Sequence, residues 1–131
     1  MCNCKTKKLS QDLGDEQQRK LVLPPFMRRY FITVIGFNKN FLYIDSCLSK
    51  EIEFLWSLGV VTTGCCCGHN FKCPYIGVRS EYSETMKKIG YKVQYNPFDP
   101  NNDNEFYPKS VKVRLKFRIN NYFMKLFRIL K

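Results

Sequence analysis

Apolar residues recur at the spacing of one helix face in two stretches of the chain, and a glycine ends each stretch. The apolar positions are Leu48, Ile52 and Leu55 in the first stretch and Tyr82, Met86 and Ile89 in the second. Gly59 and Gly90 follow these stretches, and glycine readily takes the left-handed conformation found just past a helix end. The pattern therefore predicts one helix over 47–58 and a second between Ser80 and Gly90.

Short runs of aromatic and β-branched residues predict the strands. These runs cover 26–37, 41–44, 60–63, 75–79 and 91–95. Together with the two helices, the elements from Phe41 to Tyr95 follow the order β-α-β-β-α-β, which is ferredoxin-like. The polar segment 96–108 contains several Asn and Pro residues and is expected to be a loop. We therefore expect an α+β fold in which a group of cysteines and a histidine lies at the tip of the central hairpin.

The end of the chain alternates strictly between apolar and cationic residues. The apolar positions are Val111, Val113, Leu115, Phe117 and Ile119, and the cations between them are Lys112, Arg114, Lys116 and Arg118. Alternation with a period of two predicts a strand with one buried and one cationic face. From Phe123 to Leu130 the apolar residues return at helical spacing, so a short basic amphipathic helix is expected to follow the strand.

The length of 131 residues fits one small domain. Because Pro24-Pro25 disfavours helix on both sides, residues 1–25 are expected to form an extended arm. Residues 26–108 would then be the α+β core, and 109–131 a basic strand and amphipathic segment. Every apolar run falls short of the ~18 residues that span a bilayer, and the first residues lack the apolar core of a secretory signal. The cytoplasm is therefore the expected compartment, where thiols stay reduced.

The positive charge is concentrated towards the two ends of the chain. Residues 1–40 carry eight Lys and Arg against three acidic residues, residues 41–108 carry six against eight, and residues 109–131 carry eight against none. A net charge of +11 placed in this way favours an anionic partner such as nucleic acid or a nucleoprotein. The candidate contacts are Arg28, Arg29, Lys112, Arg114, Lys116 and Arg118. The alternative is that these charges only keep the surface hydrated.

Four of the seven cysteines lie within nine residues, beside the only histidine. This segment is Gly64-Cys65-Cys66-Cys67-Gly68-His69-Asn70, followed three residues later by Cys73. Thiolates and imidazole bind Zn²⁺ in a tetrahedron at about 2.0–2.3 Å, so a compact loop of this kind can supply two or three of four ligands. Neighbouring side chains of an extended segment point to opposite sides, which favours Cys65 and Cys67 as a pair, with His69 next. The further candidate ligands are Cys73, Cys2, Cys4 and Cys47.

Two other interpretations of the cysteine segment remain open. The thiols can be buried core residues or free. A cysteine close to His69 can also act as a nucleophile, with Asp45 or Asn70 orienting the imidazole. A catalytic centre needs one activated thiol, whereas this segment has several, so we expect a binding module rather than an enzyme. Asp45 precedes the first predicted helix, where an Asp or Ser commonly caps the helix start.

Several motifs resemble small proteins of bacteriophages and of prophages in low-GC bacteria. They are an N-terminal Cys2-x-Cys4, Ile44-Asp45-x-Cys47, Leu55-Trp56-Ser57-Leu58-Gly59, the Cys-Cys-x-Gly-His sequence of residues 65–69, and Phe106-Tyr107-Pro108-Lys109. The resemblance covers most of the first 110 residues and implies a viral or mobile-element origin with a shared Cys/His site. It also raises an alternative function, in which the protein inhibits a host defence protein by direct contact. Residues 52–68 are similar over a short stretch to the methyltransferases of wybutosine synthesis, which modify tRNA.

Overall fold

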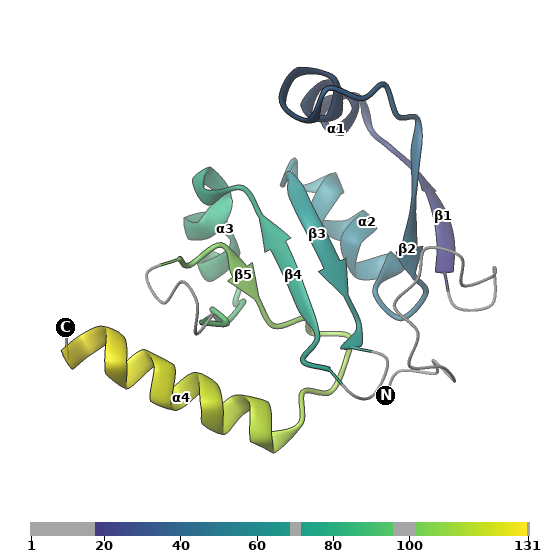
Figure 1. Ribbon diagram of the computed structural model, residues 1–131. Helices are drawn as coiled ribbons and strands as arrows, with labels where there is room; N and C mark the ends of the chain where they lie inside the picture. Colours follow the sequence, from purple (N-terminus) through teal and green to yellow (C-terminus); the bar gives the residue numbers. More distant parts are fainter. Residues whose placement is uncertain (1–17, 69–71, 96–101, 131) are drawn as a thin grey trace.

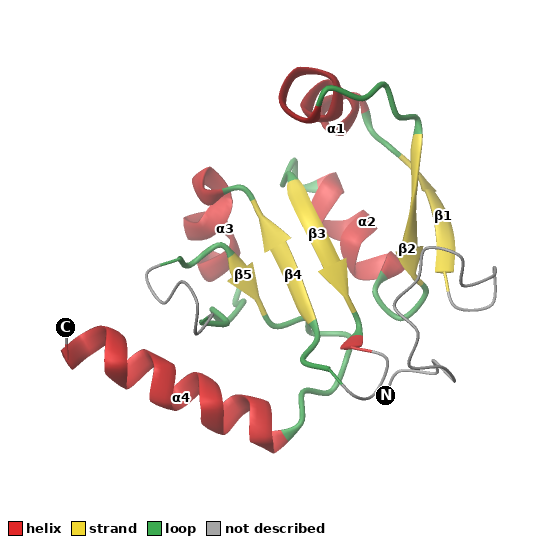
Figure 2. Cartoon of the chain, in the orientation of Figure 1, coloured by secondary structure: helices red, strands yellow, loops and turns green. Residues whose placement is uncertain are grey.

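The computed structural model describes residues 18–68, 72–95 and 102–130, and for 127–130 it describes the backbone alone. Its elements are the strands β1 (Gln18–Val22), β2 (Phe41–Asp45), β3 (Thr62–Cys66), β4 (Tyr75–Val78) and β5 (Glu105–Phe106), the α-helices α1 (Pro25–Tyr30), α2 (Ser49–Ser57), α3 (Ser83–Lys88) and α4 (Leu115–Leu130), a π-helical turn at Phe31–Ile35 and a 3-10 turn at Ser80–Tyr82. The expected α+β class is confirmed (Figures 1 and 2).

The strands form two separate antiparallel sheets. One has the order β3-β4-β5, and the other is the pair β1-β2. Helix α2 contacts both β1 and β3, so it joins the two sheets. The core between these elements is built from fully buried side chains that include Leu48, Ile52, Leu55, Ile76, Met86 and Phe106.

Both helices expected from apolar spacing are confirmed as α2 and α3, and the expected glycine follows two residues after the end of each. Gly59 has φ +80° and Gly90 has φ +93°, the left-handed conformation that a side chain would strain. The apolar positions Leu48, Ile52 and Leu55 have no exposed surface. At the far end of α2, Trp56 Nε1 donates a hydrogen bond to Thr62 Oγ1 at 2.9 Å, which links the helix to β3.

The strand predicted over 26–37 is wrong, because this segment is helical. Pro25 occupies the first turn of α1, where a residue without an amide hydrogen costs no hydrogen bond and has a backbone angle suited to a helix. The amides of Met27 and Arg28 both donate to Pro24 O at 3.0 Å, and Met27 is fully buried. Gly36, with φ +89°, ends the π-helical turn. The Pro-Pro pair therefore starts a helix rather than excluding one.

The strand predicted over 111–119 is also wrong. Val111 and Val113 are buried as the alternation requires, but Leu115 begins α4 and is 71% exposed. In the described part of this segment, no residue after Ser110 pairs with a strand, and a helix satisfies its own backbone groups without a neighbour. Lys112, Arg114, Lys116 and Arg118 therefore do not share one strand face.

The ferredoxin-like order is not confirmed. Strand β2 pairs with β1 and does not join the sheet of β3, β4 and β5. The run 91–95 forms only an isolated bridge, Val93 to Phe106, and β5 lies within the segment expected to be a loop. None of the helices in the described ranges is long and apolar enough to cross a membrane.

Candidate functional site

The cysteine segment begins inside a strand rather than at a hairpin tip. Cys65 pairs with Ile76 and Cys66 with Tyr75 in the β3-β4 ladder. Cys67 follows directly and is buried, and Gly68 has φ +80° where the chain leaves the strand. The hairpin brings Cys65, Cys66 and Cys67 to the end of the β3-β4-β5 sheet, and His69 lies outside the described residues.

Asp45 holds the cysteine segment against the β1-β2 sheet. Its buried Oδ2 accepts a hydrogen bond from the amide of Cys67 at 2.9 Å. The helix cap predicted for Asp45 or Ser46 is not made, because the first turn of α2 is preceded by Leu48 and no side chain caps it. The backbone oxygen of Asp45 accepts a hydrogen bond from the Leu48 amide at 2.8 Å. The carboxylate of Asp45 thus binds the cysteine segment without capping the helix.

The thiols of Cys65 and Cys73 are harder to ionise than an ordinary cysteine thiol. Burial raises the pKa of Cys65 to about 12, and the charges of Asp45 and Glu51 act in the same direction. Burial raises the pKa of Cys73 to about 11, against the opposing effect of a hydrogen bond that Gln94 Nε2 donates to its sulfur at 2.7 Å. A nucleophilic cysteine needs a lowered pKa, so the surroundings of these two thiols do not favour thiolate chemistry.

The expected zinc ligands are spread over different parts of the structure. Cys65 lines a hollow beside Asp45 and β2, whereas Cys73 lines another hollow beside α4. Cys47 packs against the core. Within the described ranges, no three His, Cys, Asp or Glu side chains come close enough together to hold a metal ion. Cys2, Cys4 and His69 lie outside those ranges, so a four-ligand site would have to draw on them.

Glu51 of α2 ties down the segment that precedes α4. Its carboxylate accepts hydrogen bonds from the Tyr91 hydroxyl at 2.6 Å, from the Lys109 amide at 2.8 Å, and from the amide and hydroxyl of Ser110. Burial and this bond to Glu51 both raise the pKa of Tyr91, so its hydroxyl keeps its proton and remains a donor. The contacts fix the position of residues 109–110.

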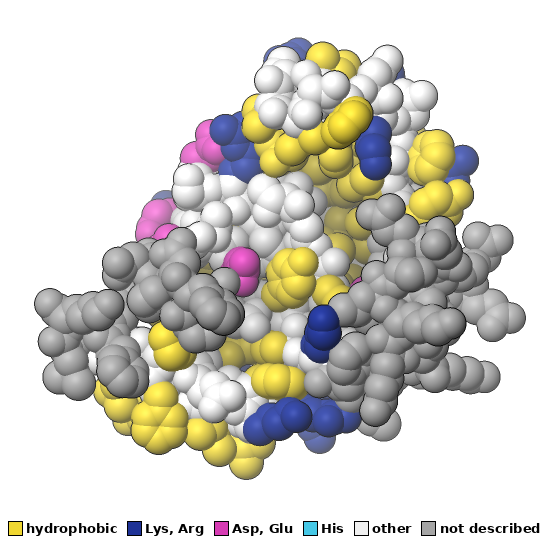
Figure 3. Space-filling model, viewed as in Figure 1, with side chains coloured by type: hydrophobic (Ala, Val, Ile, Leu, Met, Phe, Trp, Pro, Cys, Tyr) yellow, Lys and Arg dark blue, Asp and Glu magenta, His cyan; other side chains and the backbone are white. Residues whose placement is uncertain are grey.

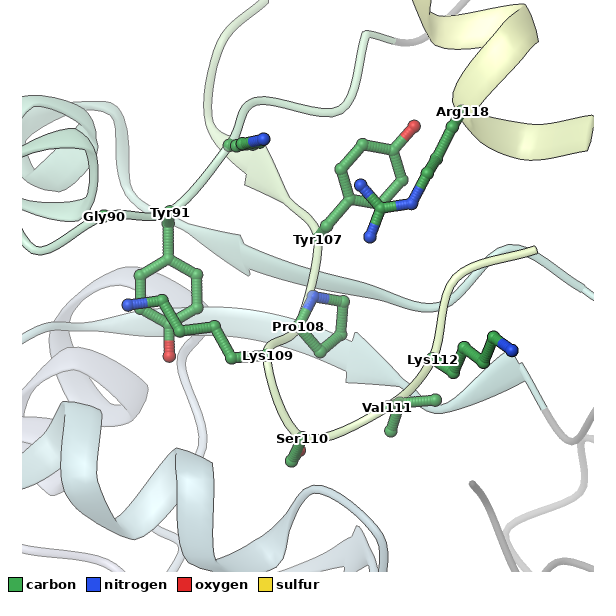
Figure 4. Close-up of a pocket in the computed structure, with 10 residues that line it drawn as sticks. Gly90, Tyr91, Tyr107, Pro108, Lys109, Ser110, Val111, Lys112 and Arg118 are labelled. Atoms are coloured by element: carbon green, nitrogen blue, oxygen red, sulfur yellow. The ribbon is translucent and has the colours of Figure 1, made fainter. Parts of the chain in front are cut away.

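A pocket of about 510 Å³ opens above this segment and is lined by four cations and no acidic residue (Figure 4). The cations are Lys92, Lys109, Lys112 and Arg118. Lys109 Nζ donates to Ile89 O at 2.6 Å and lies 4.4 Å from the centre of the Tyr91 ring, and the Arg118 guanidinium lies 5.7 Å from the centre of the Tyr107 ring. The carboxylate of Glu51 accepts hydrogen bonds from the backbone amides of Lys109 and Ser110 and does not line this hollow. We call this hollow the basic pocket.

The structure brings together only part of the predicted cationic set. Lys112 and Arg118 line the basic pocket, while Arg114 and Lys116 are exposed nearby, at the start of α4. Arg28 and Arg29 belong to α1, at the opposite end of the molecule from α4 (Figure 1). Dark blue side chains gather where α4 begins in Figure 3. Lys92 was missed because it lies in the near-neutral middle of the chain, where no sequence pattern singles it out.

A second hollow, of about 350 Å³, lies between α4 and the segment that contains Val93. It is lined by the aromatic residues Tyr95, Tyr107, Phe117 and Phe123, by the amides Gln94, Asn120 and Asn121, and by Cys73 and Met124. Asn121 fixes α4 here, because its Oδ1 accepts from the Tyr95 amide at 2.6 Å and its Nδ2 donates to Val93 O at 3.0 Å. We call this the aromatic hollow. Tyr107 lines both it and the basic pocket.

Comparison of the chain with protein-family models, with curated proteins and with solved structures finds no match.

Proposed function

We propose that the protein binds nucleic acid, with the basic pocket receiving a backbone phosphate. The observation that carries this proposal is that Lys92, Lys109, Lys112 and Arg118 line one pocket without an acidic residue among its lining. Guanidinium and ammonium groups are the usual protein partners of phosphate. The excess of positive charge over the whole chain, +11, adds long-range attraction to a polyanion. In this proposal the protein is a binding module and not an enzyme.

The arrangement of the pocket supports a preformed phosphate site. The segment carrying Lys109 is held by Glu51 through two backbone amides, at 2.8 and 2.9 Å. Arg118 lies over the ring of Tyr107, which restricts where its guanidinium can point. Because Lys109 and Arg118 are already positioned, they lose less conformational entropy on binding a phosphate than unconstrained surface lysines would lose.

The proposal predicts a steep dependence of affinity on salt. Each phosphate neutralised releases counterions, so log K falls with log salt by about 0.7 to 0.9 per contact. With three or four cations engaged we expect a slope of about −2 to −4 for a labelled 12-nucleotide oligonucleotide, measured by fluorescence anisotropy between 20 and 300 mM KCl. Absence of binding at 20 mM KCl, or a slope near zero, would contradict the proposal.

A second candidate function is inhibition of a host defence protein by direct contact. The exposed apolar residues Ile32, Val34, Ile35 and Phe37 lie together after α1 and favour it, because such patches commonly mark protein interfaces. Yellow side chains gather over this region at the top of Figure 3. The resemblance to phage proteins also supports a role inside an infected cell. The affinity for a protein partner bound through this apolar surface would change little with salt concentration. This difference distinguishes the second candidate function from nucleic-acid binding.

We also propose that the cysteine segment contributes to a zinc site, with Cys65, Cys67 and His69 as ligands and further ligands from Cys73, Cys2, Cys4 or Cys47. The donor set suits zinc, and the hydrogen bond from the Cys67 amide to Asp45 supports this position by fixing the backbone between Cys65 and Gly68.

Native mass spectrometry of protein purified without chelator tests the zinc site. We expect one zinc ion per chain, lost in Cys67→Ser and in His69→Ala. Cys66→Ser is the matched control and should retain zinc, because the Cys66 sulfur accepts the Gly68 amide at 3.3 Å and is not among the proposed ligands. Wild-type protein that carries no metal would rule the site out.

A further inference from the structure

We propose that the aromatic hollow receives one unpaired nucleobase while the basic pocket holds an adjacent phosphate, so that the preferred ligand is single-stranded nucleic acid. This inference rests on the proposed function and names its ligand class. The two cavities share Tyr107 as a common wall, one being cationic and the other aromatic. A nucleotide has the same two parts, a charged phosphate and a flat aromatic base.

The composition of the hollow suits a base. Four aromatic rings line it, and a volume of about 350 Å³ exceeds what a single base requires. Stacking on aromatic side chains is the usual way in which proteins hold bases of single strands without reading their sequence, since every base has a flat face. An aliphatic groove for a partner helix would need no such concentration of rings.

Gln94, one of the residues that line the hollow, carries a hydrogen-bond acceptor without a partner in the part of the chain that the structure describes. Gln94 Oε1 is buried and accepts no hydrogen bond from any residue in the described ranges, although Nε2 of the same amide donates to Cys73. An unsatisfied buried oxygen is costly. Every nucleobase carries at least one N–H donor on its pairing edge, which is free in a single strand and occupied in a duplex.

Tyr107 links the two cavities. Its hydroxyl donates to Phe117 O at 3.3 Å, which attaches the wall to the first turn of α4, and Arg118 covers its ring from the side of the basic pocket (Figure 4). Burial raises the pKa of Tyr107, and so does the nearby Cys73, against the effect of Arg118. The side chain of Tyr107 is thus neutral and fixed in position. A single-stranded nucleic acid that crosses it would place a base on one side and the adjacent phosphate on the other.

The decisive probes are a 12-nucleotide oligo(dA), an oligomer of the same length with abasic residues, and a 12-base-pair duplex, each labelled and measured by anisotropy at one low salt concentration. The abasic oligomer retains the phosphates and lacks the bases. We expect oligo(dA) to bind about tenfold more tightly than either the abasic oligomer or the duplex. Equal affinity for all three would overturn the base site and leave the proposed nucleic-acid binding intact, whereas no binding of any probe would contradict both.

A variant of the hollow completes the test. Phe123 lines it and is 54% exposed, so Phe123→Ala should fold. We expect this variant to bind oligo(dA) and the abasic oligomer within twofold of each other, with duplex binding unchanged. Leu115→Ala is the matched control, since Leu115 is an exposed apolar residue of the same helix that does not line the hollow. Equal loss in both variants, or no loss in Phe123→Ala, would contradict the proposal.

Discussion

Replacing Phe106 by alanine is expected to lower the free energy of unfolding by about 3–5 kcal/mol, the usual cost of removing a fully buried phenyl ring. Phe106 has no exposed surface, lies in β5 opposite Ile76, and forms the isolated bridge with Val93. Its ring also meets that of Tyr91 edge to face, with an interplanar angle of 79° and centroids 6.5 Å apart. Because β4 and the segment with Tyr91 and Val93 both meet β5 at this one residue, the cavity left by alanine cannot be filled by a small shift of one of them.

Chemical denaturation followed by circular dichroism measures this loss, and Phe54→Ala provides the matched control. Phe54 belongs to α2 and is 52% exposed, so its replacement should change the free energy of unfolding by less than about 1 kcal/mol. Equal effects of the two substitutions would mean that β5 is not part of the core.

Phe106 also illustrates which parts of the fold the sequence can predict. Helices α2 and α3 follow from apolar residues at helical spacing and from a terminal glycine, which are local signals. The burial of Phe106 depends on β4 and on Val93, which lie outside the residues next to it in the sequence. The surrounding Asn, Asp and Pro residues indicate a loop, and two residues that pair within such a loop leave no periodic signal.

Two segments misled the sequence interpretation because their composition fits more than one structure. Alternating Val and Lys or Arg residues from 111 favour a strand. The sequence from Leu115 can also wind as a helix, which places Phe117, Asn121 and Met124 against the aromatic hollow. Aromatic and β-branched residues from 26 favour a strand, yet Pro25 begins a helix there. Among the strands of the described ranges, none pairs with either segment, and a helix satisfies its own backbone groups without such a partner.

The candidate site was predictable only in part. The basic end of the chain pointed to Lys112 and Arg118, but Lys92 and Tyr107 come from other segments, and no pattern of charge or spacing connects them with these cations. Nothing in the sequence indicates that Glu51 binds residues 109–110. Contacts between residues nearly sixty positions apart arise from tertiary folding, which spacing along the chain does not encode.

Reversing two charges in the basic pocket is expected to have the largest effect on function. In the double variant Lys112→Glu and Arg118→Glu, two phosphate contacts are lost and two repulsive charges replace them. We expect affinity for a single-stranded oligonucleotide at low salt to fall about 100-fold. This loss corresponds to two tenfold steps of about 1.4 kcal/mol in binding free energy. The slope of log K against log salt should become shallower by about 2.

The same reversal on α1 separates a specific pocket from a general effect of charge. The variant Arg28→Glu and Arg29→Glu changes the net charge by the same amount at the opposite end of the molecule (Figure 1). If the basic pocket holds the phosphate, this control should weaken binding only a few-fold, through the long-range field. Equal losses in the two variants would show that total charge governs binding, and the pocket would then no longer account for it. Thermal unfolding of both variants checks that each is folded, since these four side chains are exposed and lie outside the core.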